Sequence, residues 1–458
     1  MKTKKSYSLK SNSARASFWT IINFVVSQLL RFFSNLILTR LLLPELFGLM
    51  AIVTVVRVGV YMCSEIGLKV NIIRHENGES PDVLNTAWTI QVIRGVILWG
   101  VISFIGWLLF FLTDKGMIPP DSIYSDSRLP SLLAVTGVVA FITGFESTRI
   151  WLAQRNMMLG RLSLLDLFSQ FVGLVVMIVW AWVYKDVWAL VVGTIVSAFL
   201  KTVLSHFVLV GSSNYFYWDK KIVNEFLHFG KWLSISAMVT FVGLNGDRMI
   251  LGGVISAEQL GFYTVAYFLA TSMKDLLESL TFNVWYPLLS KVNREEREKV
   301  VNIYYGIRQK LDIAIFFIVG LLYVTAPLII EILYDDRYQS AGWMLQILAI
   351  TIIGSGFRLG STLLLSMGNP KIGTYAITLR TVVLLCMIPS GYNYYGIEGA
   401  IWAIAVNPLF EMPIILWFFS KYKIISWFKE IKYIPISAVG YFSGVIFLDT
   451  YNYMKEIF

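Results

Sequence analysis

Runs of about twenty apolar residues, the length of helix that crosses a bilayer, recur along almost the whole sequence. With 57% hydrophobic and 15% charged residues among 458, the composition excludes an ordinary soluble protein. The sequence predicts an all-α polytopic membrane protein. Twelve spans are expected near residues 17–38, 46–68, 86–112, 130–152, 162–184, 187–210, 231–254, 260–285, 311–333, 341–366, 372–390 and 396–420, with a shorter thirteenth near 433–449.

The basic residues between these spans predict the orientation of the chain. Cytoplasmic loops of membrane proteins hold Lys and Arg in excess. With the N-terminus in the cytoplasm, most loop cations fall on the cytoplasmic side, and the exterior segments carry only Arg40, Lys115, Arg128, Lys185, Arg337 and Lys455. The basic tail of residues 1–15 enters the first span without a small-residue cleavage site, so no removable signal peptide is expected.

A weak internal repeat predicts how the spans are grouped. An offset of 213 residues places Leu38–Gly48 on Leu251–Gly261 and aligns Glu45 with Glu258, although few identities support the match. Because this offset carries the first span onto the seventh, it predicts two pseudo-symmetric six-helix bundles of the same orientation. The predicted parts are a basic cytoplasmic tail (1–15), an N-terminal lobe (16–212), a cytoplasmic linker (213–230), a C-terminal lobe (231–420), and a basic segment with a short extra helix (421–458).

Nine cationic side chains lie inside the predicted spans. A cation in the bilayer centre costs at least about 2.5 kcal/mol, so each must face water, a counter-ion or a ligand. Polar residues recur at helical spacing around several of them, which places them on faces turned away from lipid. The nine are Arg31, Arg57, Arg94, Arg149, Lys201, Arg248, Lys274, Arg358 and Arg380.

Two interpretations of these cations are open. They are either structural ion pairs, such as Lys274 with its i,i+4 neighbour Glu278, Asp247 with Lys274 or Glu65 with Arg57, or parts of an anion site. The acids within the spans are fewer than the bases, so some cation is expected to lack a protein partner, and arginine binds phosphate bidentately. We therefore predict a diphosphate site, and its candidate residues are Arg31, Arg57, Arg248, Lys274, Arg358 and Arg380.

Three buried acids, Asp247, Glu65 and Asp166, are candidates for coupling transport to an ion, because a titrating or cation-binding carboxylate can bias two conformations. No cofactor is expected beyond a coupling Na⁺ or H⁺. The three histidines form no metal-ligand spacing, and no Gly-rich Lys-Ser/Thr loop for ATP occurs. The two cysteines fall in predicted spans, which argues against disulfides and thiolate metal sites. The net charge of +9 is assigned to membrane orientation and not to nucleic-acid binding.

Several motifs resemble those of the polysaccharide-transport (Wzx-type) flippases, members of the superfamily that also holds multidrug/toxin extruders and the lipid II flippase. The resemblance is carried by residues 39–51, 151–156, 247–253, 260–266, 287–290 and 365–369, and thus extends over nearly the whole chain. It implies two six-helix bundles forming a V, alternating access, and a cationic cavity for the pyrophosphate of an undecaprenyl-linked oligosaccharide. The family's cationic positions match Arg31, Arg57, Arg248 and Lys274.

The function expected from this resemblance is translocation of O-antigen, capsule or exopolysaccharide repeat units from the cytoplasmic to the periplasmic leaflet of the bacterial inner membrane. The expected partners are this lipid-linked oligosaccharide, membrane lipid and the polysaccharide polymerase machinery. One alternative is a cation-coupled drug or metabolite antiporter of the same superfamily. A second is a membrane glycosyltransferase or polymerase, but the short exterior loops offer no room for a catalytic domain.

Overall fold

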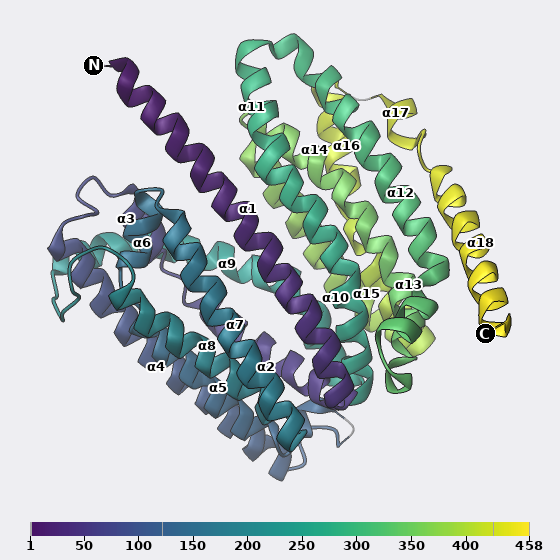
Figure 1. The fold of residues 1–458 in the computed structure, drawn as a ribbon, viewed down its shortest axis with the longest axis horizontal. Helices are drawn as coiled ribbons and strands as arrows, with labels where there is room; N and C mark the ends of the chain where they lie inside the picture. The colour runs from purple at the N-terminus through teal and green to yellow at the C-terminus, as the bar shows by residue number, and fades with distance from the viewer. Residues whose placement is uncertain (1, 121, 425, 458) are drawn as a thin grey trace. The chain divides into compact units, whose positions relative to one another are not determined.

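Helices joined by short loops make up the computed structural model, which describes residues 2–120, 122–424 and 426–457 (Figure 1). Within these residues no strand occurs, so the predicted all-α class is confirmed. The chain divides into two compact units, Met1–Phe241 and Val242–Phe458. The division falls inside a long helix, whereas the sequence analysis placed a linker at 213–230. The two six-helix lobes remain a prediction.

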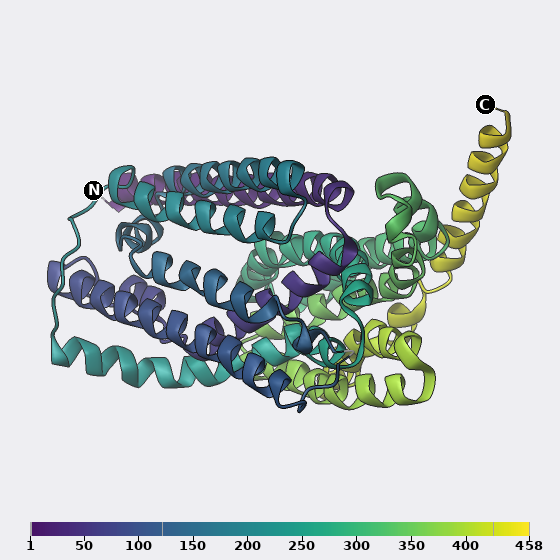
Figure 2. The ribbon, with the colours of Figure 1, turned by 90° about the horizontal axis from the view of Figure 1, so that it is seen from below.

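The first unit is built from nine α-helices among the described residues, the last of which continues into the second unit. A 3-10 turn, Ile123–Ser125, precedes the fifth helix. Figure 2 shows these helices from a second direction. They are α1 (Lys2–Leu41), α2 (Pro44–Cys63), α3 (Leu68–Arg74), α4 (Pro81–Asp114), α5 (Leu129–Gly144), α6 (Arg149–Arg155), α7 (Leu159–Tyr184), α8 (Trp188–Phe207) and α9 (Lys220–Val254).

Local sequence signals explain where these helices begin and how they pack. Prolines stand at the first position of α2 and α4, where a missing N–H costs no helical hydrogen bond. The α7–α8 pair approaches closely through glycines: a Cβ on Gly173 would lie 2.8 Å from the Gly193 carbonyl oxygen. Small residues allow this approach between membrane helices, where van der Waals packing drives association.

The second unit contains α10 (Ala257–Leu280), a π-helical turn (Thr281–Trp285), α11 (Tyr286–Glu295) and α12 (Val300–Leu333). Further along, α13 (Ala341–Leu348), a 3-10 turn (Ala349–Ile353) and α14 (Gly354–Ser366) form one apolar run. The remaining elements are α15 (Pro370–Val406), a 3-10 turn (Asn407–Glu411), α16 (Met412–Lys421), α17 (Trp427–Ile431) and α18 (Ile436–Ile457), with short 3-10 turns at Arg297–Lys299 and Asp336–Tyr338.

Although α15 is continuous by its bounds, it is a hairpin of two limbs. The backbone leaves the helical conformation at Tyr395 and Gly396, and Gly396 has a φ of 61°, which favours glycine. A Cβ on Gly391 would lie 2.5 Å from the Gly399 carbonyl oxygen, so the limbs touch beside the break. The predicted spans 372–390 and 396–420 therefore correspond to two helical limbs that fold back on each other.

The described helices satisfy the length and hydropathy expected of a polytopic membrane protein. Eight helical segments among them are long and apolar enough to cross a bilayer, or ten if the bent pairs α5–α6 and the two parts of α9 each count as one span. The predicted spans 260–285 and 433–449 fall on α10 and α18, which are helical but are not among these segments. The polytopic prediction is confirmed, and a span count of twelve or thirteen stays a prediction.

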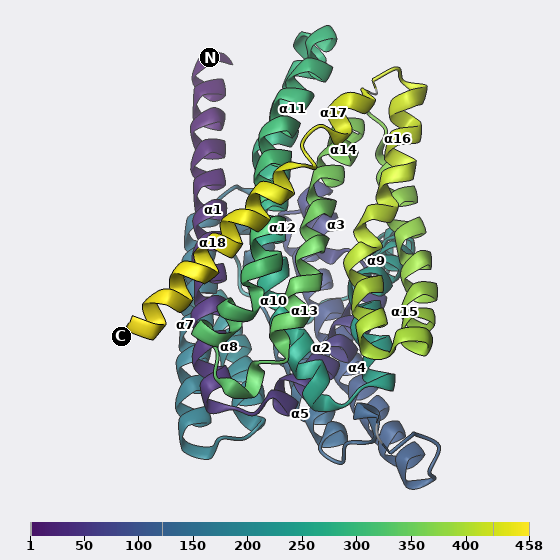
Figure 3. The same cartoon turned by 90° about the vertical axis from the view of Figure 1, so that its right-hand side faces the viewer.

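The C-terminal helix α18 packs along α12 (Figure 3) through backbone contacts at glycines. A Cβ on Gly440 would collide with the Phe317 carbonyl oxygen. We expect Gly440→Ala to displace α18 and lower the free energy of unfolding by about 1–3 kcal/mol through overpacking, measured by thermal unfolding of the purified protein. Gly373→Ala is the matched control, because a Cβ there meets nothing within 4 Å. Equal midpoints for both variants would refute this account of the packing.

Candidate functional site

Several of the predicted site residues map to two polar centres, each within one unit. In the first unit, Arg57 of α2 lines a cavity of about 320 Å³ together with residues of α5, α7 and α8. Its polar lining comprises Arg57, Thr143, Glu146, Gln170, Thr194, Ser197 and Lys201. Polar side chains on four helices therefore face one space, as expected for an intramembrane stripe turned away from lipid.

Lys201 is shared by two carboxylates in this centre. Its Nζ lies 3.1 Å from Asp166 Oδ1 and 3.9 Å from Glu146 Oε1. All three side chains are partly buried, at 35%, 30% and 19% exposure respectively. Only Asp166 of this triad was predicted from the sequence as a site residue. The sequence does contain a signal for the triad, because Lys201 is one of the nine cations in the predicted spans and both acids also lie in predicted spans.

Arg57 differs from Lys201 in having no carboxylate partner. Among the described residues, its half-buried side chain forms no ion pair or hydrogen bond with protein. Tyr61, one turn further along α2, instead bonds to Thr143 at 2.8 Å between the two hydroxyl oxygens. Arg57 is thus the cation that the acids of this cavity leave uncompensated, and its five N–H donors are available to an anion.

The other two predicted residues of the first unit lie elsewhere. Glu65 does not pair with Arg57, which corrects one of the pairs considered from sequence; its Oε2 lies 3.4 Å from Arg94 Nη2. Its second carboxylate oxygen accepts from the Gly67 amide at 2.7 Å, so Glu65 anchors the end of α2. Arg31 is exposed on α1 and is not in the lining of the cavity.

The second unit brings three predicted residues together. Asp247 of α9, Lys274 of α10 and Arg380 of α15 line a cavity of only about 20 Å³. This volume holds about one water molecule. Tyr263 donates its hydroxyl hydrogen to one Asp247 oxygen, while the other, Oδ1, has no hydrogen-bond partner among the described residues. In this conformation the centre does not admit a diphosphate.

Three of the four predicted cations of the second unit have carboxylate partners. Arg380 contacts Glu411 at 3.0 Å and the side-chain oxygen of Asn407 at 2.7 Å. Glu278 lies between two cations, 3.7 Å from Lys274 and 3.8 Å from Arg358. Of the two pairs considered for Lys274, the structure shows the one with Glu278.

Arg248 is the last predicted residue, and it points to an aromatic ring. Its guanidinium carbon lies 4.8 Å from the centre of the Tyr267 ring, a cation–π contact. Its Nε is buried without a hydrogen-bond partner among the described residues. Arg248 is therefore adjacent to the Asp247 centre through Tyr267, which lines the same cavity.

The second unit also contains a buried ion network that was not predicted from the sequence. Arg308 of α12 contacts Asp312 at 3.0 Å and Glu430 of α17 at 3.0 Å, and these side chains are only 4%, 4% and 1% exposed. The Arg308 Nη1 also donates to the Tyr304 hydroxyl at 2.8 Å. Glu430 lies within a basic segment whose sequence is typical of an exposed surface, so the sequence pattern did not predict its burial.

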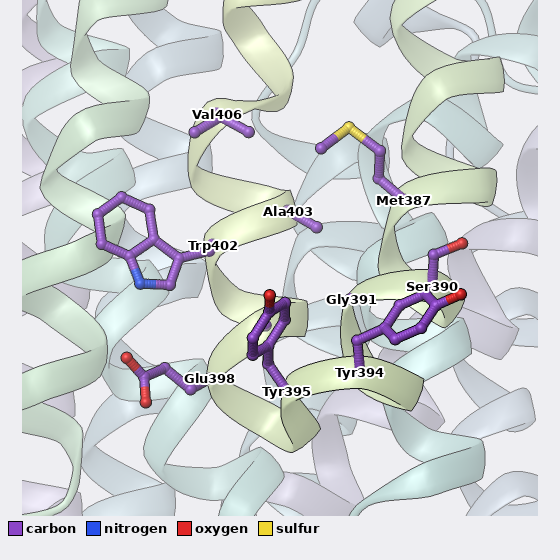
Figure 4. Close-up of a pocket in the computed structure, with 10 residues that line it drawn as sticks. Met387, Ser390, Gly391, Tyr394, Tyr395, Glu398, Trp402, Ala403 and Val406 are labelled. Carbon is purple, nitrogen blue, oxygen red and sulfur yellow. The ribbon is translucent and has the colours of Figure 1, made fainter.

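A further cavity lies apart from the charged centres in its lining. About 560 Å³ in volume, it lies at the tip of the α15 hairpin and is lined by Tyr394, Tyr395, Glu398 and Trp402 (Figure 4). Its lining contains no Lys or Arg and shares no residue with the two polar centres. Tyr and Trp at a hairpin tip are typical of the membrane–water interface, so this cavity is not the anion site.

Comparison with known sequences identifies relatives across most of the chain. Residues 37–342 match the family described as polysaccharide biosynthesis protein. The teichuronic acid biosynthesis protein TuaB of Bacillus subtilis is 20% identical, with 81% of this chain and 76% of that protein covered. The lipopolysaccharide biosynthesis protein WzxC of Escherichia coli is also 20% identical, with 79% and 69% covered. An uncharacterized membrane protein in the cps region of Klebsiella pneumoniae is 22% identical, but the match covers only 59% of its length.

Solved structures share the fold. An inward-facing multidrug resistance MATE family transporter superposes with a TM-score of 0.66 at 14% identity, covering 88% of this chain and 98% of that one. The lipid II flippase MurJ in an inward closed conformation gives 0.64 at 15% identity, covering 94% and 99%. The predicted exporter-superfamily fold is confirmed. Since the matching family spans more than half of the sequence, the chain belongs to the polysaccharide biosynthesis protein family.

Proposed function

We propose that this protein is a flippase, not an enzyme, that moves undecaprenyl-pyrophosphate-linked oligosaccharide repeat units across the bacterial inner membrane by alternating access. The units are those of O-antigen, capsule or exopolysaccharide, carried from the cytoplasmic to the periplasmic leaflet, where a polymerase uses them. The N-terminus is cytoplasmic in this proposal. Membership of the polysaccharide biosynthesis family and a fold shared with a lipid flippase support it.

The observation that carries the proposal is Arg57, a membrane-embedded arginine without a protein partner among the described residues, in a cavity of about 320 Å³. Its planar guanidinium matches two phosphate oxygens at once. The cavity is at the small end of ligand sites. It therefore suits the diphosphate, the part shared by all such substrates, and leaves the glycan and the polyprenyl chain outside.

We further propose that buried acids couple transport to H⁺ or Na⁺. Asp166 is the first candidate, because it shares Lys201 with Glu146, and adding a proton or Na⁺ to this group changes its charge balance. Asp247 is the second, since one of its oxygens has no hydrogen-bond partner among the described residues. Glu65 is bound by Arg94 and the Gly67 amide and is the third.

We expect Asp166→Asn to reduce transport and to remove its dependence on the ion gradient, because the amide cannot take up a proton at this position. The measurement is flipping of a labelled lipid-linked sugar in proteoliposomes with and without an imposed gradient. Asp186→Asn, at the opposite end of α7 beyond Tyr184, is the control and should retain gradient dependence. An Asp166→Asn protein that still follows the gradient would exclude Asp166 from coupling.

A second candidate function is an antiporter for cationic drugs or metabolites. The Asp247 oxygen without a partner is the specific observation that favours it, since a buried carboxylate can bind an organic cation. The two functions are separated by exposing a host with and without the gene to cationic drugs. Increased sensitivity on deletion, with surface polysaccharide unchanged, would favour the antiporter.

The experiment that tests the proposed function is mass spectrometry of lipid-linked sugars, with surface polysaccharide assayed in parallel, in a host that lacks the gene. We expect complete lipid-linked units to accumulate and surface polymer to disappear, and the gene to reverse both effects. Truncated units would show instead that the protein builds the glycan. An unchanged pool of units with normal surface polymer would reject the flippase.

A further inference from the structure

A basic cavity of about 300 Å³ lies between α12 and α17, apart from the two polar centres. Asn302, Tyr305 and Gln309 line it from the first turns of α12, and Lys429 and Lys432 line it from α17 and the turn that follows. Because these residues are near the N-terminal end of a 34-residue apolar helix, the cavity lies near one surface of the membrane and not at its centre.

The floor of this cavity holds one cation and two carboxylates, whereas its rim holds two lysines. Arg308 at the floor contacts both Asp312 and Glu430, so its charge is compensated. In contrast, neither Lys429 nor Lys432 pairs with a carboxylate in the part of the chain that the structure describes. The excess charge at the mouth of the cavity is therefore positive.

Aromatic rings hold the two lysines at the cavity. The Lys429 ammonium lies 4.8 Å from the centre of the Tyr305 ring, and that of Lys432 lies 5.3 Å from the centre of the Tyr433 ring. Cation–π contacts of this kind restrict a lysine without neutralising it. The Tyr305 hydroxyl in turn donates to Glu430 at 3.1 Å, which connects the rim to the buried network.

The surroundings of the cavity are apolar and exposed. Phe428 is 68% exposed at its edge, and on the adjoining helix α18 Phe442 and Ile446 are 64% and 67% exposed. In a membrane protein such side chains contact acyl chains. A ligand that fits must therefore combine an anionic group with hydrocarbon tails.

We propose that this cavity binds the phosphate group of an anionic phospholipid, with Lys429 and Lys432 as the phosphate-binding cations and α18 as the surface for its acyl chains. Basic pockets between membrane helices near the bilayer surface recognise phospholipid headgroups in this way. The site would attach the C-terminal segment to the lipid leaflet. This inference does not rest on the proposed flippase function, because binding is measured without transport.

The test is native mass spectrometry of the full-length protein in neutral detergent, titrated separately with phosphatidylglycerol, phosphatidylcholine and inorganic phosphate. We expect retention of phosphatidylglycerol in preference to the zwitterionic lipid. In Lys429→Gln/Lys432→Gln this affinity should fall by about 30-fold, since each lysine near an anionic headgroup contributes about a factor of five. Lys429→Arg/Lys432→Arg should retain binding, and this result would show that the segment still folds when both lysines are replaced.

The matched control is Lys421→Gln/Lys423→Gln, which removes the same charge from the same segment outside the cavity lining. It should bind phosphatidylglycerol like the wild type. An equal loss in this control would overturn the site in favour of general attraction to basic residues. Equal binding of phosphatidylcholine would also overturn it, and so would saturable binding of inorganic phosphate with no preference for the lipid.

Discussion

Arg57→Gln is expected to abolish surface polysaccharide while the protein reaches the membrane at wild-type abundance. Glutamine keeps the approximate length and polarity of the side chain but loses the charge and the bidentate fork. Removing one partner of a buried, hydrogen-bonded charge pair costs about 2–5 kcal/mol of binding, so transport should fall by at least about 30-fold. Since Arg57 has no protein partner among the described residues, folding should be little affected. Lipid-linked units and surface polymer are the quantities to measure.

Two comparisons make this result specific to the cavity. Arg57→Lys should give intermediate transport, because an ammonium supplies the charge without the planar pair of donors. Arg161→Gln removes an exposed arginine of α7 that is not in the cavity lining, and it should transport normally. If Arg57→Gln transports as well as Arg161→Gln, the cavity does not bind the diphosphate.

The helices of the fold were predictable because a long apolar run in a membrane protein can adopt few structures other than a membrane helix. All thirteen expected spans fall on described helices, and the break between the spans 372–390 and 396–420 coincides with Gly396, where only a flexible residue suits the backbone. The division after Phe241 was not predictable, because it falls inside one predicted span, 231–254.

The charged centres were only partly predictable, since residue spacing gives the face of a helix but not its neighbour. Glu65 follows Arg57 by two helical turns, about 12 Å along the axis, and it contacts Arg94, because the rotation and register of α2 against α4 decide the pair. The opposite case is Glu430, whose basic neighbours suggested the surface. Its contact with Arg308 depends on how the chain returns after α16.

This long-range contact leads to the largest expected effect on stability. Arg308→Met should lower the free energy of unfolding by about 3–5 kcal/mol, because it leaves two carboxylates buried without a cation. Asp312 and Glu430 are 4% and 1% exposed and cannot reach solvent without moving α12 or α17. Thermal or denaturant unfolding of the purified protein measures the change.

A surface pair provides the matched control for this prediction. Arg337 and Asp335 form an ion pair whose side chains are 38% and 32% exposed, so Arg337→Met should cost no more than about 1 kcal/mol. Replacing the whole network, as in Arg308→Met/Asp312→Leu/Glu430→Leu, should recover much of the lost stability, because no charge then remains buried. If Arg308→Met unfolded like Arg337→Met, the carboxylates would be protonated or hydrated in the membrane, and the network would not hold α17 against α12.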